Sequence, residues 1–298
     1  MISVCIPIYN QNLESLVAGL EAQLQELSPP AEIVLIDDAS DKIFQQQNRP
    51  LGKKHTYVEL PKNVGRARIR NLFLEHARHD YLLFLDGDAA LLGNNLLSNY
   101  RDALQHFTPV VCGGSIYPTQ KPPRKQRLRW KNGHFRESKP ALERNQHPNQ
   151  SFMTNNFLIH RSIFEIIRFD ERLTQYGHED TLFGFELKQQ GIRVLHIENP
   201  VLNPDIDSNE IFLYKTEQGI KNLIRIVREF NYPDQLKQEI SLLRVAGLLE
   251  KRSSFFLILH RISKRFFRLW LKSGYAPLFI FNLYKLGYYL EKNQLKLS

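Results

Sequence analysis

A run of apolar residues, Tyr81 to Leu85, ends directly on two acids, Asp86 and Asp88, which are separated by Gly87. A continuous apolar run of this length is typical of a strand that is covered on both faces, as the strands of parallel sheets are. Open α/β sheets bind ligands at the carboxyl ends of such strands. Mg²⁺ and Mn²⁺ bind through one or two carboxylates and share their other positions with water and phosphates. The segment therefore predicts a metal site, with an ordinary polar turn as the alternative.

Two more apolar strands precede this one. The first covers residues 2–9 and is expected to break at Pro7, and the second covers residues 32–36 and runs into Asp37 and Asp38. A helical pattern follows each of them. Strands that alternate with helices and end on polar residues predict a doubly wound parallel sheet that binds a nucleotide or a similar ligand at that edge.

Five short motifs resemble those of glycosyltransferase family 2, which has the GT-A fold. The resemblance covers residues 1–205 and implies an α/β fold with a Rossmann-like, mostly parallel sheet flanked by helices. It also implies transfer of a sugar from a nucleoside diphosphate donor, with uridine as the nucleoside. The motifs occupy residues 4–10, 36–40, 63–71, 86–88 and 177–180.

The resemblance implies roles for individual residues. Asp88, together with Asp86, would hold the metal, which is Mn²⁺ or Mg²⁺. Family members often carry a histidine late in the domain as a further metal or phosphate contact, and Asn203 occupies that position here. His196 lies nearby but is interpreted as an in-strand residue, so the ligand set stays open. The residues implied in donor binding are Pro7, Tyr9, Asp37, Asp38, Asn63, Arg70, Asp86 and Gly87.

A second acidic pair starts a helical pattern within residues 175–187. Glu179 and Asp180 are expected at the helix N-terminus, where the dipole favours carboxylates, and a purely stabilising first turn is the alternative. An acceptor hydroxyl must lose its proton in the transition state, which a positioned carboxylate can accept. The segment resembles the tryptophan-glycine-acid motif of galactosyltransferases, which implies Asp180 as the base. Glu179, His178 and Asn156 are the expected acceptor contacts.

The length and composition fit one large α/β domain with an appendage, because the chain has 298 residues of which 42% are hydrophobic. We expect a catalytic domain over residues 1–205 and a basic helical extension over residues 206–298. The catalytic domain is expected to contain a nucleotide-sugar half (1–115), a flexible basic loop (116–150) and an acceptor half (151–205).

The sequence predicts a cytoplasmic location. Cys5 and Cys112 are the only cysteines and lie in apolar contexts, which indicates a reducing compartment without a disulfide framework. Met1 leads directly into a strand without a basic leader segment. No stretch reaches the roughly 18 apolar residues that a membrane-spanning helix needs.

The net charge of +9 is concentrated in two segments. Residues 119–150 carry nine Lys or Arg against two Glu. We interpret this segment as a flap that stabilises the departing diphosphate or engages a phosphorylated acceptor, and a solvated loop is the alternative. Residues 251–272 carry seven Lys or Arg and no acid.

The helical pattern of residues 251–272 has an apolar face and a basic face. This pattern predicts an interfacial helix on an anionic membrane, which would make the protein peripheral on the inner face of the plasma membrane. Helices that pack on the catalytic domain would show the same pattern. The apolar run at residues 278–284 favours the membrane, since one domain edge needs less apolar surface. The expected apolar face comprises Phe255, Ile258, Leu259, Ile262, Phe266, Leu269 and Trp270, and the basic face Arg261, Lys264, Arg265, Arg268 and Lys272.

The sequence thus predicts a metal-dependent, inverting hexosyltransferase that acts on a bacterial surface polysaccharide or a lipid-linked saccharide. A sugar nucleotidyltransferase is the alternative, although such an enzyme would show a glycine-rich loop after the first strand, and residues 7–12 contain no glycine. A nucleic-acid-binding protein is the other alternative. It is disfavoured because no recognisable nucleic-acid motif accompanies the basic segments, so no nucleic-acid partner is expected.

Overall fold

The computed structural model describes residues 1–28, 31–104, 108–174, 176–229, 234–249 and 253–294, without the side chains of residues 229 and 253–255. Its contacts divide the chain into two compact units. The first unit comprises residues 1–118, 137–174 and 179–205, and the second comprises residues 119–136, 175–178 and 206–298.

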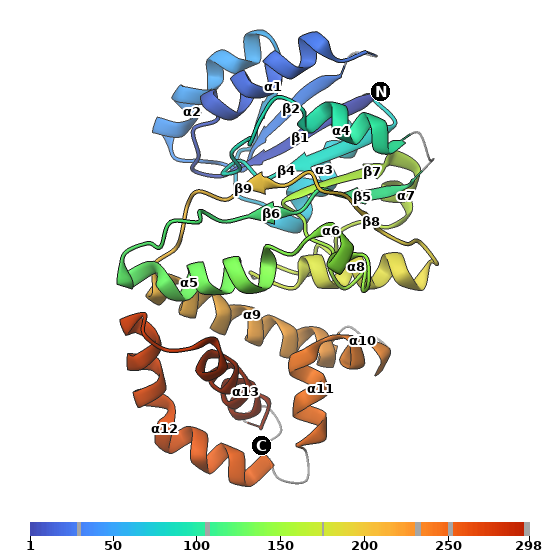
Figure 1. Ribbon diagram of the computed structural model, residues 1–298. Helices are drawn as coiled ribbons and strands as arrows, with labels where there is room; N and C mark the ends of the chain where they lie inside the picture. Colours follow the sequence, from blue (N-terminus) through green and yellow to red (C-terminus); the bar gives the residue numbers. More distant parts are fainter. Residues whose placement is uncertain (29–30, 105–107, 175, 230–233, 250–252, 295–298) are drawn as a thin grey trace. The chain divides into compact units, whose positions relative to one another are not determined.

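The first unit is built on a seven-stranded sheet with the order β3-β2-β1-β4-β7-β5-β8 (Figure 1). All neighbouring pairs are parallel except those of β7, which runs antiparallel to β4 and β5. The expected mostly parallel α/β sheet is therefore confirmed. The strands are β1 (Ile2–Ile8), β2 (Glu32–Asp37), β3 (Thr56–Glu59), β4 (Tyr81–Leu85), β5 (Val110–Cys112), β7 (Asn156–His160) and β8 (Leu195–His196), with β6 (Ser115–Ile116) and β9 (Val201–Leu202) forming a separate pair.

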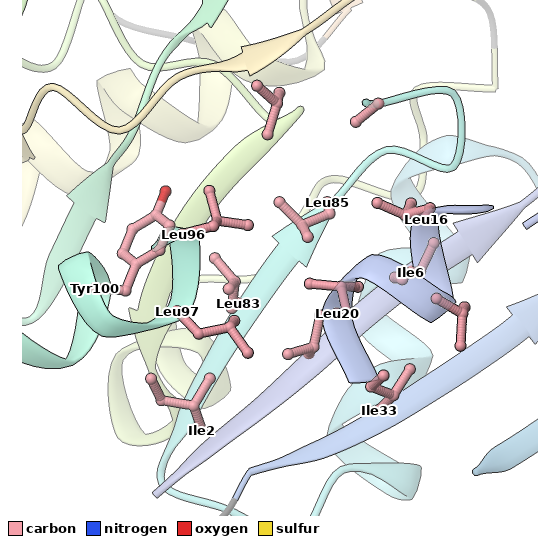
Figure 2. Close-up of a cluster of buried hydrophobic side chains, with 14 of the residues drawn as sticks. Ile2, Ile6, Leu16, Leu20, Ile33, Leu83, Leu85, Leu96, Leu97 and Tyr100 are labelled. Atoms are coloured by element: carbon pink, nitrogen blue, oxygen red, sulfur yellow. The ribbon is translucent and has the colours of Figure 1, made fainter. Parts of the chain in front are cut away.

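Helices cover the first unit's sheet on both faces (Figure 1). Alternate strand residues point to opposite faces, so each central strand contributes to two apolar clusters. On one face, Leu83 and Leu85 of β4 pack with Leu20 of helix α1 and Leu97 of helix α4 (Figure 2). The helices of this unit are α1 (Glu14–Glu26), α2 (Lys42–Asn48), α3 (Arg66–His76), α4 (Leu96–Ala103), α6 (Ala141–Arg144), α7 (Arg161–Ile166) and α8 (Glu179–Gln189).

The opposite face of the sheet is rich in aromatic side chains. Phe84 of β4 stacks on Phe157 of β7 at a centroid distance of 4.8 Å, and its edge meets Phe73 of α3 at 5.6 Å. Phe183 of α8 belongs to the same cluster and stacks on Phe169 at 4.3 Å. Strand β4 is thus buried on both sides, as its apolar run predicts, and α3 and α8 are anchored to one face of the sheet.

Pro7 does not break β1, which corrects the sequence expectation. The strand runs from Ile2 to Ile8, and Pro7 is paired with Ile36 of β2. On its other side β1 pairs with β4 only as far as Cys5. Because the ladder with β4 has already ended there, the missing N–H of proline leaves no bond of that ladder unmade.

The second unit is helical. Its helices are α5 (Arg127–Asn132), α9 (Asn209–Glu229), α10 (Asp234–Glu239), α11 (Ser241–Leu248), α12 (Ser253–Ser273) and α13 (Leu278–Gln294). Its core joins Leu128 of α5 to Leu213 of α9, Leu271 of α12 and Phe281 of α13. None of the described helices is long and apolar enough to cross a membrane.

The basic segment 116–150 is not the loop that was expected. It contains a 3₁₀ turn, η3 (Arg124–Gln126), and the helices α5 and α6. Its first part packs into the helical unit, because Leu128 is buried there and its N–H donates to the Asn209 side chain at 2.8 Å. Its second part packs in the sheet unit, where Arg144 is buried and donates to backbone carbonyls.

The structure limits the free apolar surface that was expected of the carboxyl-terminal helices. Most of the run at residues 278–284 is not free apolar surface, because Ile280, Phe281 and Tyr284 are buried in the core of the helical unit and, of its apolar side chains, only Phe279 is largely exposed. The basic side of α12 divides, since Lys264 and Arg268 form ion pairs with acids of α13 and α9, whereas Arg261 and Arg265 are exposed. Lys251 and Arg252 lie outside the described residues, as does the side chain of Phe255.

Candidate active site

Three parallel strands of the sheet unit end at one edge. Ile8, the last residue of β1, is paired with Asp37, the last residue of β2. Leu85, the last residue of β4, lies opposite Asn156, the first residue of the antiparallel β7. The turns that follow β1, β2 and β4 therefore meet at this edge, which is where such sheets bind ligands.

The turn after β2 uses its two acids to fix the backbone. Asp37 Oδ1 accepts the Ser40 N–H at 2.7 Å. Asp38 accepts the N–H groups of Val64 at 2.6 Å and Gly65 at 3.1 Å, just before α3 begins. Burial raises the pKa of Asp38, although these two N–H donors oppose the shift. Both carboxylates thus hold the turn and the start of α3.

The turn after β4 places its acids differently. Asp86 Oδ1 accepts a 2.7 Å hydrogen bond from the guanidinium of Arg70, which is only 3% exposed. Gly87 is closely packed, because a methyl group there would lie 3.1 Å from the Leu13 side chain and 3.3 Å from the Pro7 carbonyl oxygen. The turn therefore lies closely against Pro7 of β1 and against Leu13, which directly precedes α1.

Asp88 keeps part of its surface exposed, but the surrounding protein shields its carboxylate from water and other acids crowd it. Its pKa is raised to about 6, first by loss of contact with water and then by the charge of Asp86, with a smaller contribution from Asp205. Asp205 follows β9, and Leu202 at the end of β9 exchanges two backbone hydrogen bonds with Ala90. Sequence reasoning missed Asp205, since only the pairing of β9 with residue 90 places it near Asp88.

The acidic turn fits a divalent cation. Asp86 and Asp88 repel each other, and a cation between them would relieve that repulsion. Among the described residues no group of three or more His, Cys, Asp or Glu is arranged to hold a metal. Mg²⁺ and Mn²⁺ need only one or two carboxylates when substrate phosphates and water complete the shell, so Asp88 and Asp86 suffice as protein ligands.

The second acidic pair starts helix α8. Gly177 and His178, which precede it, both have positive φ angles of 98° and 72°. Asp180 Oδ1 accepts the N–H of Thr181 at 2.7 Å and its hydroxyl at 3.3 Å. The pKa of Asp180 is raised to about 6, by burial first and then by the charge of Glu179. A carboxylate with this pKa is deprotonated at neutral pH and is still basic enough to accept a proton.

Glu179 is buried and incompletely paired. It is 7% exposed, and among the described residues its Oε2 has no hydrogen-bond partner. Its Oε1 lies 3.7 Å from the guanidinium of Arg66. An unpaired buried carboxylate oxygen is unfavourable in a folded protein, so this oxygen is a candidate for contact with a ligand hydroxyl.

Arg66 connects the two acidic groups. It is close to Glu179, and its charge also lowers the pKa of Asp88. The structure therefore brings the turn after β4 and the start of α8 to the same guanidinium. Sequence reasoning did not single out Arg66. Its position as the first residue of α3 was a usable signal, because the dipole disfavours a cation at a helix N-terminus.

The other sequence-predicted residues take several positions. Tyr9 is exposed at the end of β1, and the Asn63 amide donates to the Asp38 carbonyl at 3.2 Å. Asn156 is fully buried, and its amide bonds Tyr100, Gly114 and Asn199. The acceptor role of Asn156 stays a prediction.

His196 and Asn203, the two residues considered as a further metal contact, lie in different environments. His196 lies in β8 as expected and is buried, with Nδ1 2.8 Å from Arg144 Nη1 and Nε2 2.8 Å from the Pro148 carbonyl. Burial lowers its pKa to about 4. Asn203, in the usual histidine position, follows β9, and its N–H bonds the carbonyl of Ile116 at 2.9 Å.

Comparison with known proteins adds an independent line of evidence. A sequence model described as "Glycosyl transferase family 2" matches residues 3–167, which is more than half of the chain. An uncharacterized glycosyltransferase of Haemophilus influenzae is 34% identical over 121 residues, which cover 39% of this chain and 48% of that protein. The chain thus matches about half of that relative's length.

Solved structures share the fold. The mannosyltransferase PcManGT of Pyrobaculum calidifontis, solved with GDP-mannose and Mn²⁺, superposes with a TM-score of 0.63 at 16% identity, covering 99% of this chain and 86% of that one. Residues 1–349 of S. aureus TarS, solved with UDP-GlcNAc, superpose with a TM-score of 0.52 at 16% identity, covering 99% and 91%. At these identities the matches show a common GT-A fold.

Proposed function

Because this chain belongs to glycosyl transferase family 2, we propose that it moves a sugar from a nucleoside diphosphate to an acceptor hydroxyl with inversion at the anomeric carbon. One observation carries the assignment of the site. The Arg66 guanidinium lies 3.7 Å from the Glu179 carboxylate, and its positive charge lowers the pKa of Asp88. This shared guanidinium supports a single site that contains both the proposed metal-binding turn and the proposed acceptor-binding helix start.

The donor is proposed to bind at the edge formed by β1, β2 and β4. Tyr9 is exposed there, and Pro7, Asn63 and Arg70 lie close to the turns that form the edge. Asp37 and Asp38 shape this edge from inside. We propose a uridine diphosphate sugar, and the UDP-GlcNAc bound by TarS supports that nucleoside, whereas the GDP-mannose bound by PcManGT makes guanosine the second candidate to test.

The metal is proposed to be Mn²⁺ or Mg²⁺, held by Asp88 and Asp86. When bound, it supplies positive charge that stabilises the leaving diphosphate. Arg70 keeps Asp86 in place through the 2.7 Å hydrogen bond. Gly87 lets the turn lie against β1 without a clash.

Asp180 is proposed to be the general base. It takes the proton of the acceptor hydroxyl while that oxygen attacks the anomeric carbon, and the bond from this carbon to the diphosphate oxygen breaks. Because a single displacement occurs, the anomeric configuration inverts. Thr181 donates two hydrogen bonds to Asp180 Oδ1, and no described residue donates to Asp180 Oδ2. This second oxygen is therefore proposed to accept the proton of the acceptor hydroxyl. Glu179 and His178 are proposed to contact the acceptor.

We propose a saccharide acceptor, either a growing surface polysaccharide or a lipid-linked saccharide, and a reaction on the cytoplasmic side of the membrane. Residues 1–205 are assigned to catalysis and residues 206–298 to an accessory helical role. The basic residues 119–136, which pack with the helical unit, are assigned to that unit rather than to a loop over the site.

The test is a screen of nucleotide sugars with the full-length protein, with added Mn²⁺ and with a chelator. Release of nucleoside diphosphate from one donor, lost on chelation, is the expected result. Release of pyrophosphate would identify a sugar nucleotidyltransferase instead. The Asp88→Asn variant is the matched control, because it keeps the side-chain shape and should behave like the chelated protein.

A further inference from the structure

Helix α12 is amphipathic, and its apolar side is exposed. Ile258, Ile262 and Leu269 are 59%, 76% and 69% exposed, and Leu259 and Phe266 are exposed as well. Residues that are three, four or seven apart share one side of a helix, so these five side chains form one continuous surface, the α12 stripe. We infer that the α12 stripe binds the surface of a membrane that contains anionic lipids.

The opposite side of α12 is fixed to the rest of the helical unit. Lys264 Nζ lies 2.6 Å from Glu291 of α13, and Arg268 Nη1 lies 2.6 Å from Glu217 of α9. The Tyr284 hydroxyl donates to the same Glu217 carboxylate at 2.6 Å. These bonds determine which side of α12 faces inward, so the exposure of the stripe follows from specific contacts.

The packing of α12 does not need the stripe. Leu257 and Leu271 are 3% and 0% exposed, and Phe267 and Trp270 pack against the same core from partly buried positions, so apolar contacts outside the stripe anchor the helix. A soluble helix normally turns its apolar face to the core. Here Lys264, Arg268 and part of the apolar residues face the core, while five large apolar side chains stay exposed. An exposed apolar surface of this kind marks an interaction site.

The charges beside the stripe select an anionic partner. Arg261 and Arg265 are exposed along one flank of it, and neither forms an ion pair among the described residues. Residues 253–273 contain no Asp or Glu. Arginine can lay its alkyl stem along apolar groups and direct its guanidinium to phosphates. Apolar side chains flanked by bases are the pattern of a helix that lies in a lipid interface.

A second copy of the chain is the weaker alternative. A symmetric dimer through the stripe would bring Arg261 and Arg265 of one copy towards the same residues of the other. With no acid on α12 to compensate, that contact would be repulsive. The stripe from Ile258 to Leu269 also extends over only roughly 16 Å of helix axis, which suits shallow insertion better than a stable protein interface.

The test is co-sedimentation of the full-length protein with vesicles of phosphatidylcholine, with or without phosphatidylglycerol, at low and high salt. Binding is expected only to the phosphatidylglycerol vesicles and should fall with salt, because each base near an anionic surface strengthens binding about fivefold. The variant R261E/R265E should bind at least about 25-fold more weakly. The control K42E/K53E changes the net charge equally on the sheet unit and should bind like wild type.

A second pair of variants isolates the apolar contribution. Ile262→Glu combined with Phe266→Glu should abolish vesicle binding, whereas Ile43→Glu with Leu142→Glu, which alters exposed apolar residues of the sheet unit, should leave it unchanged. Circular dichroism and thermal unfolding of each variant exclude misfolding. Sugar transfer is not measured, so failure of the proposed enzymatic function would leave this test intact.

Three outcomes would overturn the inference. The first is absence of binding to phosphatidylglycerol vesicles at low salt. The second is equal binding by wild type and by folded I262E/F266E. The third is a dimer in solution that I262E/F266E dissociates while no vesicle binding is seen, which would assign the stripe to a second copy.

Discussion

The substitution Asp180→Asn separates catalysis from structure more cleanly than any other change in the site. Asp180 Oδ1 accepts the N–H and the hydroxyl of Thr181. The carbonyl oxygen of asparagine can accept both bonds, so the start of α8 should keep its geometry. The amide nitrogen would replace Oδ2 and cannot accept a proton, so only the base is lost.

The expected magnitude follows from that role. Loss of a general base lowers the transfer rate by about 10²–10⁴-fold, which corresponds to about 3–5 kcal/mol of transition-state free energy. Donor binding should be unchanged. The measurement is kcat for sugar transfer at saturating donor and Mn²⁺, together with calorimetric donor affinity. Glu179→Gln is the matched comparison and should act mainly on the KM of the acceptor.

The same residue predicts a pH dependence. The pKa of Asp180 is about 6, so the active deprotonated form is lost below that pH and the rate should fall about tenfold per pH unit. Saturating metal is expected to hold Asp88 deprotonated, so the acidic limb is assigned to Asp180. The residual activity of Asp180→Asn should lack this acidic limb.

Stability should change in the opposite direction. Because the pKa of Asp180 is higher in the folded than in the unfolded chain, the folded state binds more protons, and stability falls as the pH rises from about 4 to about 6. Asp180→Asn removes the cost of burying this charge as well as its repulsion with Glu179, and should raise the free energy of unfolding by about 1–3 kcal/mol at pH 7, with little gain at pH 4. Near wild-type transfer by Asp180→Asn, with the acidic limb retained, would refute the assignment and make Glu179 the next candidate.

Three further substitutions test other parts of the site. Asp88→Asn should abolish Mn²⁺-dependent donor binding without unfolding the protein, and unchanged nucleotide-sugar affinity in calorimetry would remove the metal from this residue. Arg66→Ala should reduce kcat/KM by about 10–100-fold, the value of a charge-assisted contact, and a wild-type initial rate would show that linking the two acidic groups is unimportant. Gly87→Ala should destabilise the fold by about 1–3 kcal/mol through overpacking against Leu13, and an unchanged urea midpoint would contradict the tight packing of this turn.

Local sequence patterns determined the framework of this protein. The apolar run of β4 is long enough to be recognised as a strand buried on both faces, and the acids that follow it mark the edge of the sheet. The motif at Asp86 to Asp88 and the acids that begin α8 could be found because acids that follow an apolar run or begin a helical pattern stand out in the sequence. These features depend only on residues that are adjacent in the chain, so they can be recognised from the sequence alone.

Contacts between distant segments were decided only by the tertiary structure. Asp205 is placed beside Asp88 by the pairing of β9 with residue 90, and Arg66 meets Glu179 because α3 and α8 pack on the same face of the sheet. Neither contact leaves a periodic signal in the sequence.

The orientation of α12 is the clearest case. Its sequence predicts an apolar side and a basic side but not which of them faces the core. Glu217 and Glu291, on two other helices, draw Lys264 and Arg268 inward. A helical sequence pattern specifies which side chains share a face. Which face points to the core depends on charged residues of other helices, and these come close to α12 only in the folded protein.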